Sequence, residues 1–124
     1  MKRLFILSIS LILSFTLISQ ATAQTKDDGT LRILAIGNSF SDDGTEYLPA
    51  LLENLNVKNV EVARLYVGGC TLEQHVNFYD NSEAAYKFYL SKAGENKWVE
   101  NPEKVTMQYA LAMGEWDIIT MQQA

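Results

Sequence analysis

The sequence predicts an α/β fold in which helices cover both faces of a parallel β-sheet. Short apolar runs of strand length alternate along the chain with segments whose apolar residues recur at helical spacing. A parallel sheet needs both of its faces buried, and helices on both faces would cover it. One stretch of alternating aromatic residues interrupts this order and predicts a β-hairpin insertion.

Residues 1–23 are typical of a secretory signal peptide. Lys2 and Arg3 precede the apolar segment Leu4–Ile18, and Ala21-Thr-Ala23 provides small residues at a cleavage site. The apolar segment is short for a membrane span, which favours cleavage over an uncleaved N-terminal anchor. We therefore expect a protein exported to the periplasm or the extracellular space, without a stable membrane anchor. The polar residues 24–30 are interpreted as a linker.

Composition limits the possible partners. Without residues 1–23 the chain loses two basic and no acidic residues, so its net charge falls from −5 to −7. Nucleic acids and anionic membranes require clustered basic side chains, so we expect neither as a partner. Cys70 is the only cysteine, which excludes an internal disulfide bond.

The first half of the domain is predicted to be strand, loop, helix and strand. The apolar run 31–36 is a strand, and the polar residues 41–45 are interpreted as a loop. Apolar residues at helical spacing predict a helix over 47–56, with Pro49 in its first turn. The β-branched alternation over 59–67 predicts the second strand.

The second half is predicted to be helix, hairpin, helix and strand. A helix is expected over 71–79, a β-hairpin within 81–100, a helix over 103–113 and a third core strand over 117–121. Three core strands make a thin sheet, and the sequence stops just after the third. We therefore expect residues 31–124 to be the N-terminal part of a larger domain.

The chemistry-bearing residues follow the predicted strands. Ser39 comes two residues after Gly37, at the carboxyl end of the first strand, where ligands bind in open α/β sheets. This position makes Ser39 a candidate nucleophile, and the alternative is that it caps the next helix. Asn38 is expected to support the loop through its backbone contacts. Gly68 and Gly69 follow the second strand and either approach a ligand or form an ordinary turn.

These motifs resemble the SGNH/GDSL-type hydrolases, including an uncharacterised branch of exported bacterial proteins. Gly37-Asn-Ser39 is similar to the family's first block, in which the Ser is the nucleophile. Gly68 or Gly69 is similar to the second block, whose backbone N–H binds an oxyanion. The third block usually carries an Asn, and Gln122 or Gln123 stands in that place here.

The resemblance implies a flavodoxin-like three-layer αβα fold and an esterase that works through an acyl-enzyme, with carbohydrate O-deacetylases among the activities of the family. It implies a small-molecule or carbohydrate ester as substrate and no cofactor. The family's fourth block, Asp-x-x-His, has no counterpart in residues 1–124, so the base would come from outside them and the 124 residues alone would be inactive.

Other polar residues carry weaker interpretations. His75 is the only histidine and is expected to pack on a helix rather than to serve Ser39. Cys70 is expected to be a small buried residue. Asp42 is interpreted as loop support near Ser39, with helix capping as the alternative. No His, Cys or Asp residues have metal-ligand spacing, so we expect no metal.

Two alternatives remain open on the same fold. The hairpin segment is rich in aromatic residues, which either pack on one another or stack against a sugar, so a non-catalytic glycan-binding domain is possible. The second alternative is a truncated, inactive fragment, whose exposed last strand would favour aggregation.

Overall fold

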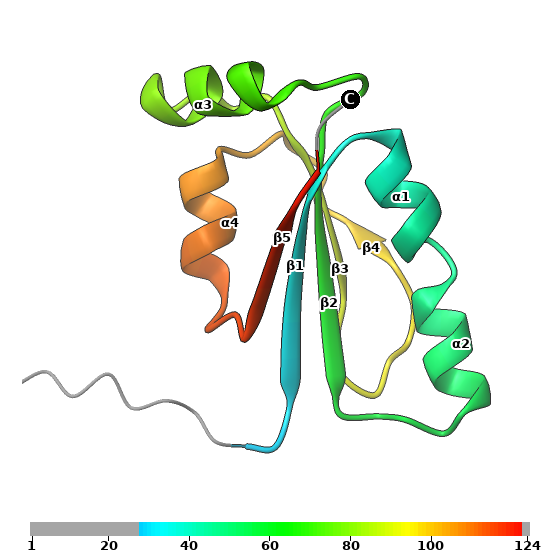
Figure 1. Ribbon diagram of the computed structural model, residues 1–124. Helices are drawn as coiled ribbons and strands as arrows, with labels where there is room; N and C mark the ends of the chain where they lie inside the picture. The colour runs from blue at the N-terminus through cyan, green and yellow to red at the C-terminus, as the bar shows by residue number, and fades with distance from the viewer. Residues whose placement is uncertain (1–27, 123–124) are drawn as a thin grey trace, which may run out of the picture.

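The computed structural model describes residues 28–122, which form a five-stranded mixed sheet flanked by helices (Figure 1). The strand order is β4-β3-β2-β1-β5. The strands are β1 (Leu31–Gly37), β2 (Val60–Tyr66), β3 (Lys87–Ser91), β4 (Val99–Glu100) and β5 (Ile118–Met121). The predicted signal peptide 1–23 and most of the linker 24–30 lie outside the described residues. No helix within 28–122 is long and apolar enough to cross a bilayer.

The prediction of a parallel sheet is correct only for β2, β1 and β5. β3 pairs antiparallel with β2, and β4 pairs antiparallel with β3. The expected hairpin is present, with Leu90 opposite Val99, and it extends the sheet beyond β2. The reason is that β2 would otherwise have an unpaired edge, and β3 satisfies its backbone groups while adding Phe88 to the core.

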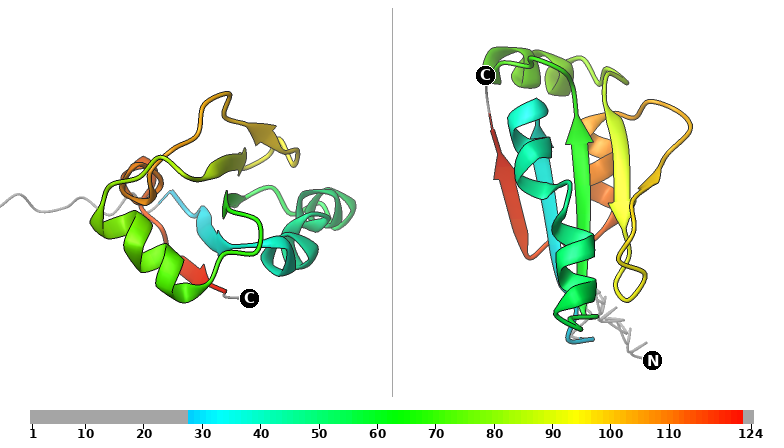
Figure 2. Two further views of the ribbon diagram at one scale, coloured as in Figure 1. Left: turned by 90° about the horizontal axis from the view of Figure 1, so that it is seen from above. Right: turned by 90° about the vertical axis from the view of Figure 1, so that its right-hand side faces the viewer.

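Helices lie against both faces of this sheet. They are α1 (Ser39–Thr45), α2 (Leu48–Asn54), α3 (Leu72–Asp80) and α4 (Met107–Met113). Figure 2 shows α1 and α2 in front of the sheet and α4 behind it, with β5 at one edge and the hairpin at the other. α3 lies above the carboxyl ends of the parallel strands (Figure 1).

The prediction of a loop over 41–45 is wrong, because these residues belong to α1. Asn38 is the N-cap, and its side chain accepts a hydrogen bond from Phe40 N at 3.1 Å. The Thr45 hydroxyl donates to Ser41 O at 2.8 Å within the helix. Ser, Asp, Gly and Thr have weak helix propensity, but a cap and tertiary contacts override such a preference.

α2 and α3 occur where they were expected, whereas α4 begins later than predicted. Pro49 lies in the first turn of α2, and Thr71 forms a capping box with Gln74 at the start of α3. The helix expected from residue 103 begins only at Met107. Val105 is extended there, because its N–H and C=O pair with Tyr86 at 2.8 and 3.1 Å.

The core lies between the sheet and α4. Its buried members are Leu34, Ile36, Ala63, Leu65, Tyr86, Phe88, Val105, Met107 and Ala110. β5 is less covered, since Ile118, Ile119 and Met121 are each about half exposed. Burial on the α4 side therefore fixes the sheet, while β5 forms an exposed apolar edge.

Candidate active site

The three parallel strands end side by side and bring three loop segments together. Val67 N donates to Gly37 O at 3.1 Å, which joins the end of β2 to the end of β1. Gln122 N donates to Ile36 O at 2.9 Å, which joins the end of β5 to the same strand. The segments after β1, β2 and β5 therefore meet at one end of the sheet, at the top of Figure 1.

Asn38 connects two of these segments from a fully buried position. Its amide oxygen caps α1, and its amide nitrogen donates to Cys70 O at 3.1 Å. The first bond orients the residue that follows Asn38, and the second holds the turn after β2 against the turn after β1. A buried amide with both its donor and its acceptor engaged makes a rigid support.

Gly37 allows the three segments to approach closely. A Cβ atom at this position would lie 2.7 Å from Ser41 Cβ and 3.4 Å from Gln122 Cβ. Any other residue would push α1 or the end of β5 away from β1. Gly37 is thus required by packing at this junction.

Ser39 is the first residue of α1, and its side chain is exposed. The cap of α1 is made by Asn38, so the alternative in which Ser39 caps the helix does not hold. Within residues 28–122 the Ser39 hydroxyl makes no hydrogen bond. The hydroxyl is therefore available to solvent at the point where β1 ends.

The other predicted site residues surround this position unevenly. Gly68 and Gly69 form an exposed turn after β2, and Gly69 has a φ of +62°, which favours glycine. Gln122 is half-buried beside Gly37. Gln123 lies outside the described residues. The structure thus brings the two glycines and Gln122 to the same end of the sheet as Ser39.

Asp42 lies one helical turn after Ser39 and pairs with a charge from the sheet. Its carboxylate is 3.5 Å from Nη1 of Arg64 on β2. Burial raises the pKa of Asp42, and the nearby Arg64 guanidinium opposes this rise. Sequence reasoning did not single out Arg64. The sequence does contain a sign of its role. Arg64 is a charged residue within a largely apolar strand, at a position where the alternation of that strand predicts a side chain that faces the interior.

His75 does not serve Ser39. It is 1% exposed on α3, its Nδ1 lies 2.8 Å from the Tyr86 hydroxyl, and the two rings stack with centroids 5.7 Å apart. Burial lowers the pKa of His75, while the backbone of Gln122 acts in the opposite direction. Burial also raises the pKa of the Cys70 thiol. Both side chains are therefore neutral packing groups at pH 7.

No cluster of three or more His, Cys, Asp or Glu side chains within residues 28–122 is arranged to hold a metal ion. The hairpin aromatics also have structural contacts. Tyr86 and Phe88 belong to the core, and Tyr89 and Trp98 stack on Arg64. The residues that would form a sugar platform are thus largely engaged within the fold.

Two comparisons place the chain among known proteins. Residues 32–124 match the family described as "Domain of unknown function (DUF4886)". The fold is similar to the crystal structure of a DUF4886 family protein from Bacteroides uniformis ATCC 8492, with 36% sequence identity and a TM-score of 0.68. The match covers 77% of this chain but 36% of that one, so the chain spans about a third of that protein's length. No curated protein matches. Neither match names the SGNH/GDSL hydrolases, so that resemblance remains a hypothesis from the motifs.

Proposed function

The chain belongs to the DUF4886 family, and from that premise we propose that it carries the nucleophile of an exported serine hydrolase. In this proposal the fold is flavodoxin-like and of SGNH type, and Ser39 attacks an ester carbonyl. The substrate class is a small or carbohydrate ester, such as an O-acetyl group on a sugar.

The exposed hydroxyl of Ser39 is the observation that carries the proposal. Asn38 performs the capping and bridging that a polar residue at a strand–helix junction usually performs. Ser39 is left with a hydroxyl that contributes no hydrogen bond to the fold within residues 28–122. A serine that a fold does not use, at the edge of the sheet where ligands bind, supports a role as nucleophile.

The neighbouring loops supply donors for a developing negative charge. When Ser39 Oγ bonds to the carbonyl carbon, the carbonyl oxygen becomes an oxyanion that requires preorganised N–H groups. The candidates are the backbone N–H groups of Ser39, Gly68 and Gly69 and the side-chain amide of Gln122 or Gln123. The bond from Asn38 to Cys70 O supports this assignment, because it holds the glycine turn next to Ser39.

The base that takes the Ser39 proton comes, in this proposal, from outside residues 28–122. His75 is buried and paired with Tyr86, so it is not the base. The proton removed from Ser39 passes to the departing alkoxide, and a water molecule then releases the acyl group as a carboxylic acid. This second step regenerates the Ser39 hydroxyl.

The test compares three proteins: wild type, Ser39→Ala and Ser41→Ala. Each is expressed from the complete coding frame and purified after export. Ser41 is a matched control, because it is a hydroxyl two residues away on α1. We expect p-nitrophenyl acetate and acetylated xylo-oligosaccharide hydrolysis to fall by roughly 10³-fold or more in Ser39→Ala. We expect Ser41→Ala to retain activity.

A fluorophosphonate probe gives an independent measurement. Mass spectrometry of the labelled wild type should find the phosphonate on the peptide containing Ser39, with N-terminal sequencing expected to begin at Gln24. Equal esterase activity in wild type and Ser39→Ala, together with no labelling, would overturn the proposal. Glycan binding that survives Ser39→Ala would then favour the non-catalytic alternative.

A further inference from the structure

We propose that Arg64 is a positioning residue that connects the β3–β4 hairpin to α1 and thereby holds Ser39 in place. The effect on catalysis rests on the proposed function. The connection itself rests on contacts within the fold. It gives the hairpin a role at the candidate site, although none of its residues lies among the predicted site residues.

Arg64 is unusually enclosed for a charged residue. It is 7% exposed in the middle of β2, and its ion pair with Asp42 places its side chain on the face of the sheet that α1 covers. Its guanidinium lies between two rings of the hairpin, with its central carbon 4.7 Å from the centroid of Tyr89 and 4.2 Å from that of Trp98. A planar cation between two aromatic faces is held in one orientation.

The same cluster contacts α1 at two points. The Arg64 guanidinium is 3.5 Å from the Asp42 carboxylate. The Trp98 indole N–H donates to the backbone oxygen of Glu46, the C-cap of α1, at 2.8 Å. Trp98 therefore contacts both the guanidinium and the end of the helix. Figure 1 shows that β4, the edge strand of the sheet, is turned toward the side on which α1 lies.

Together with the N-cap, these contacts hold α1 at three points. α1 is seven residues long and is held at its start by Asn38. Asp42 holds its middle, and the Glu46 carbonyl holds its end. Because Ser39 and Asp42 are three residues apart, they lie on the same side of the helix. A shift of Asp42 would therefore move Ser39 relative to the glycine turn.

The choice of arginine also indicates a geometric role. Within the described residues, Arg64 Nε is buried and makes no hydrogen bond. Burying an incompletely paired charge is unfavourable compared with an apolar side chain of the same size. An arginine at this position contributes orientation, because lysine cannot stack as a plane between two rings while it contacts a carboxylate.

The experiment compares wild type with Arg64→Lys, Arg64→Met and Trp98→Phe in the full exported protein. Arg64→Lys keeps the charge and loses the stacking, whereas Arg64→Met loses both. Trp98→Phe keeps a ring but removes the donor to Glu46 O. Lys92→Met is the matched control, because it removes an exposed cation of the same hairpin.

Two measurements distinguish the connection between the hairpin and α1 from its effect on catalysis. Hydrogen–deuterium exchange should rise at the amides of residues 42–46 in both Arg64 variants and near residue 46 in Trp98→Phe, but not in Lys92→Met. In ester hydrolysis, kcat should fall by about tenfold or more in Arg64→Met, with KM changed by less than about twofold, because misplacing a nucleophile affects the chemical step.

Unchanged exchange over α1 in the folded Arg64→Lys and Trp98→Phe variants would overturn the connection. Faster exchange with unchanged kcat would overturn the positioning of Ser39. If Ser39→Ala retains full activity while exchange in the Arg64 variants rises, the proposed function fails and the connection between hairpin and helix stands.

Discussion

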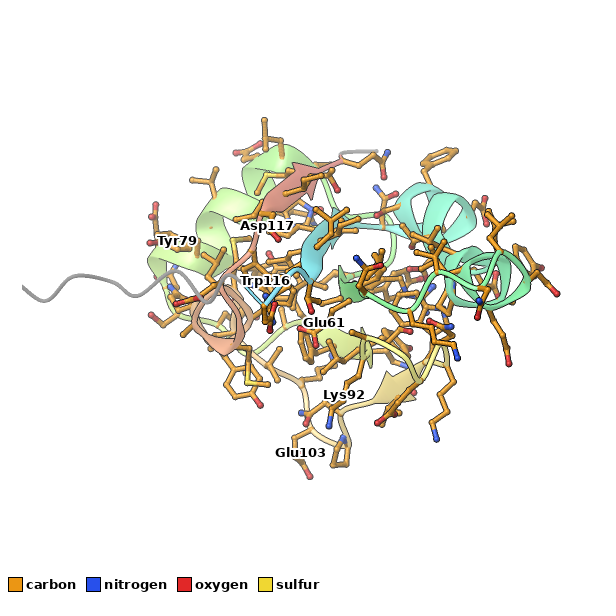
Figure 3. All side chains as sticks on the ribbon, turned by 90° about the horizontal axis from the view of Figure 1, so that it is seen from below. Glu61, Tyr79, Lys92, Glu103, Trp116 and Asp117 are labelled. Atoms are coloured by element: carbon orange, nitrogen blue, oxygen red, sulfur yellow. The ribbon has the colours of Figure 1, made fainter. Side chains whose placement is uncertain are left out.

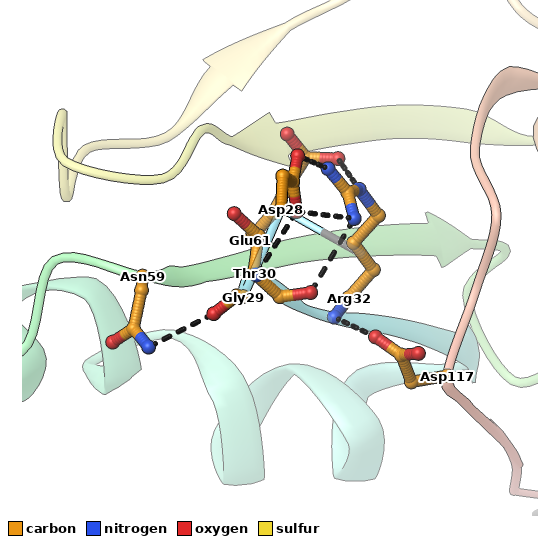
Figure 4. Close-up of polar contacts among 7 residues, drawn as sticks. All are labelled: Asp28, Gly29, Thr30, Arg32, Asn59, Glu61 and Asp117. Carbon is orange, nitrogen blue, oxygen red and sulfur yellow. Dashed lines mark hydrogen bonds and ion pairs between the residues drawn. The ribbon is translucent and has the colours of Figure 1, made fainter. Parts of the chain in front are cut away.

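The two ends of the parallel strands contrast in charge and in burial. At the amino end, Arg32 pairs with Asp28 at 2.6 Å and lies 4.0 Å from Glu61, and its backbone N–H donates to Asp117 Oδ2 at 2.7 Å (Figure 4). Figure 3 looks onto this end, with Glu61 and Asp117 labelled. At the carboxyl end, the uncharged residues Gly37, Asn38 and Ser39 meet the glycine turn and Gln122.

The contrast separates stability from a candidate function. The charged groups of the amino end are partly exposed and form ion pairs and hydrogen bonds with one another. Such exposed pairs contribute little to the free energy of unfolding, and their charges are already paired without a ligand. The carboxyl end is held by a buried amide and close backbone packing, yet it presents an exposed serine. A rigid support beneath an exposed hydroxyl is consistent with the role proposed for Ser39.

The strongest test of this contrast removes a side-chain amide from each end. Asn38→Ala loses the cap of α1 and leaves the buried Cys70 carbonyl without its donor. We expect a loss of about 2–4 kcal/mol in the free energy of unfolding. Asn59→Ala loses an exposed bond to Gly29 O at the amino end, and we expect a loss below about 1 kcal/mol. Urea denaturation measures both, and equal losses would contradict the contrast.

A second pair of variants tests the packing at Gly37. Gly37→Ala places a Cβ atom 2.7 Å from Ser41 Cβ, and we expect it to destabilise the protein by about 1–3 kcal/mol. Gly44→Ala is the control, because a Cβ there meets no atom within 4 Å. Since Gly44 lies inside α1, we expect alanine to stabilise the protein by up to about 1 kcal/mol. Thermal unfolding that ranks the two variants in the reverse order would show that the junction is loosely packed.

The histidine above the carboxyl end predicts a dependence of stability on pH. Burial lowers the pKa of His75 in the folded protein, so the unfolded chain binds the proton more tightly. The free energy of unfolding should therefore decrease as pH falls below about 6.5, the ordinary pKa of histidine. His75→Gln should remove this component, and comparison of the NMR spectra of wild type and His75→Gln assigns the titration to His75, the only histidine among residues 1–124. A folded-state pKa at or above the ordinary value would contradict the burial argument.

The amino end predicts the smallest effect, at lower pH. The hydrogen bond from Arg32 is the main cause that holds the pKa of Asp28 below its ordinary value near 4. The stabilisation is complete above pH about 4 and is lost as pH falls through the lowered pKa. Asp28→Asn should abolish this pH dependence. Because the pair is exposed, high salt should weaken the effect in wild type, and an effect insensitive to salt would count against this origin.

The order of most helices and strands could be predicted from the sequence, whereas the bounds of α1 and α4 could not. The apolar run 31–36, the alternation over 59–67 and the helical spacing over 71–79 predicted β1, β2 and α3 correctly. Residues 41–45 were assigned to a loop, because local propensity does not include the cap from Asn38. The start of α4 was also predicted too early, since the pairing of Val105 with Tyr86 joins residues that are distant in sequence.

Sequence by itself determined which residues stand at the carboxyl ends of the strands, because strand length and glycine positions are local properties. It thus indicated Ser39, Gly68 and Gly69 at the strand ends, and the family resemblance added Gln122 or Gln123. Only the tertiary structure decided that Asn38, and not Ser39, caps α1, and that the hairpin adds to β2. It also decided that Arg64 lies between two rings and contacts α1. The reason is physical: these outcomes depend on which buried polar groups find partners, and the partners come from segments that only the folded sheet brings together.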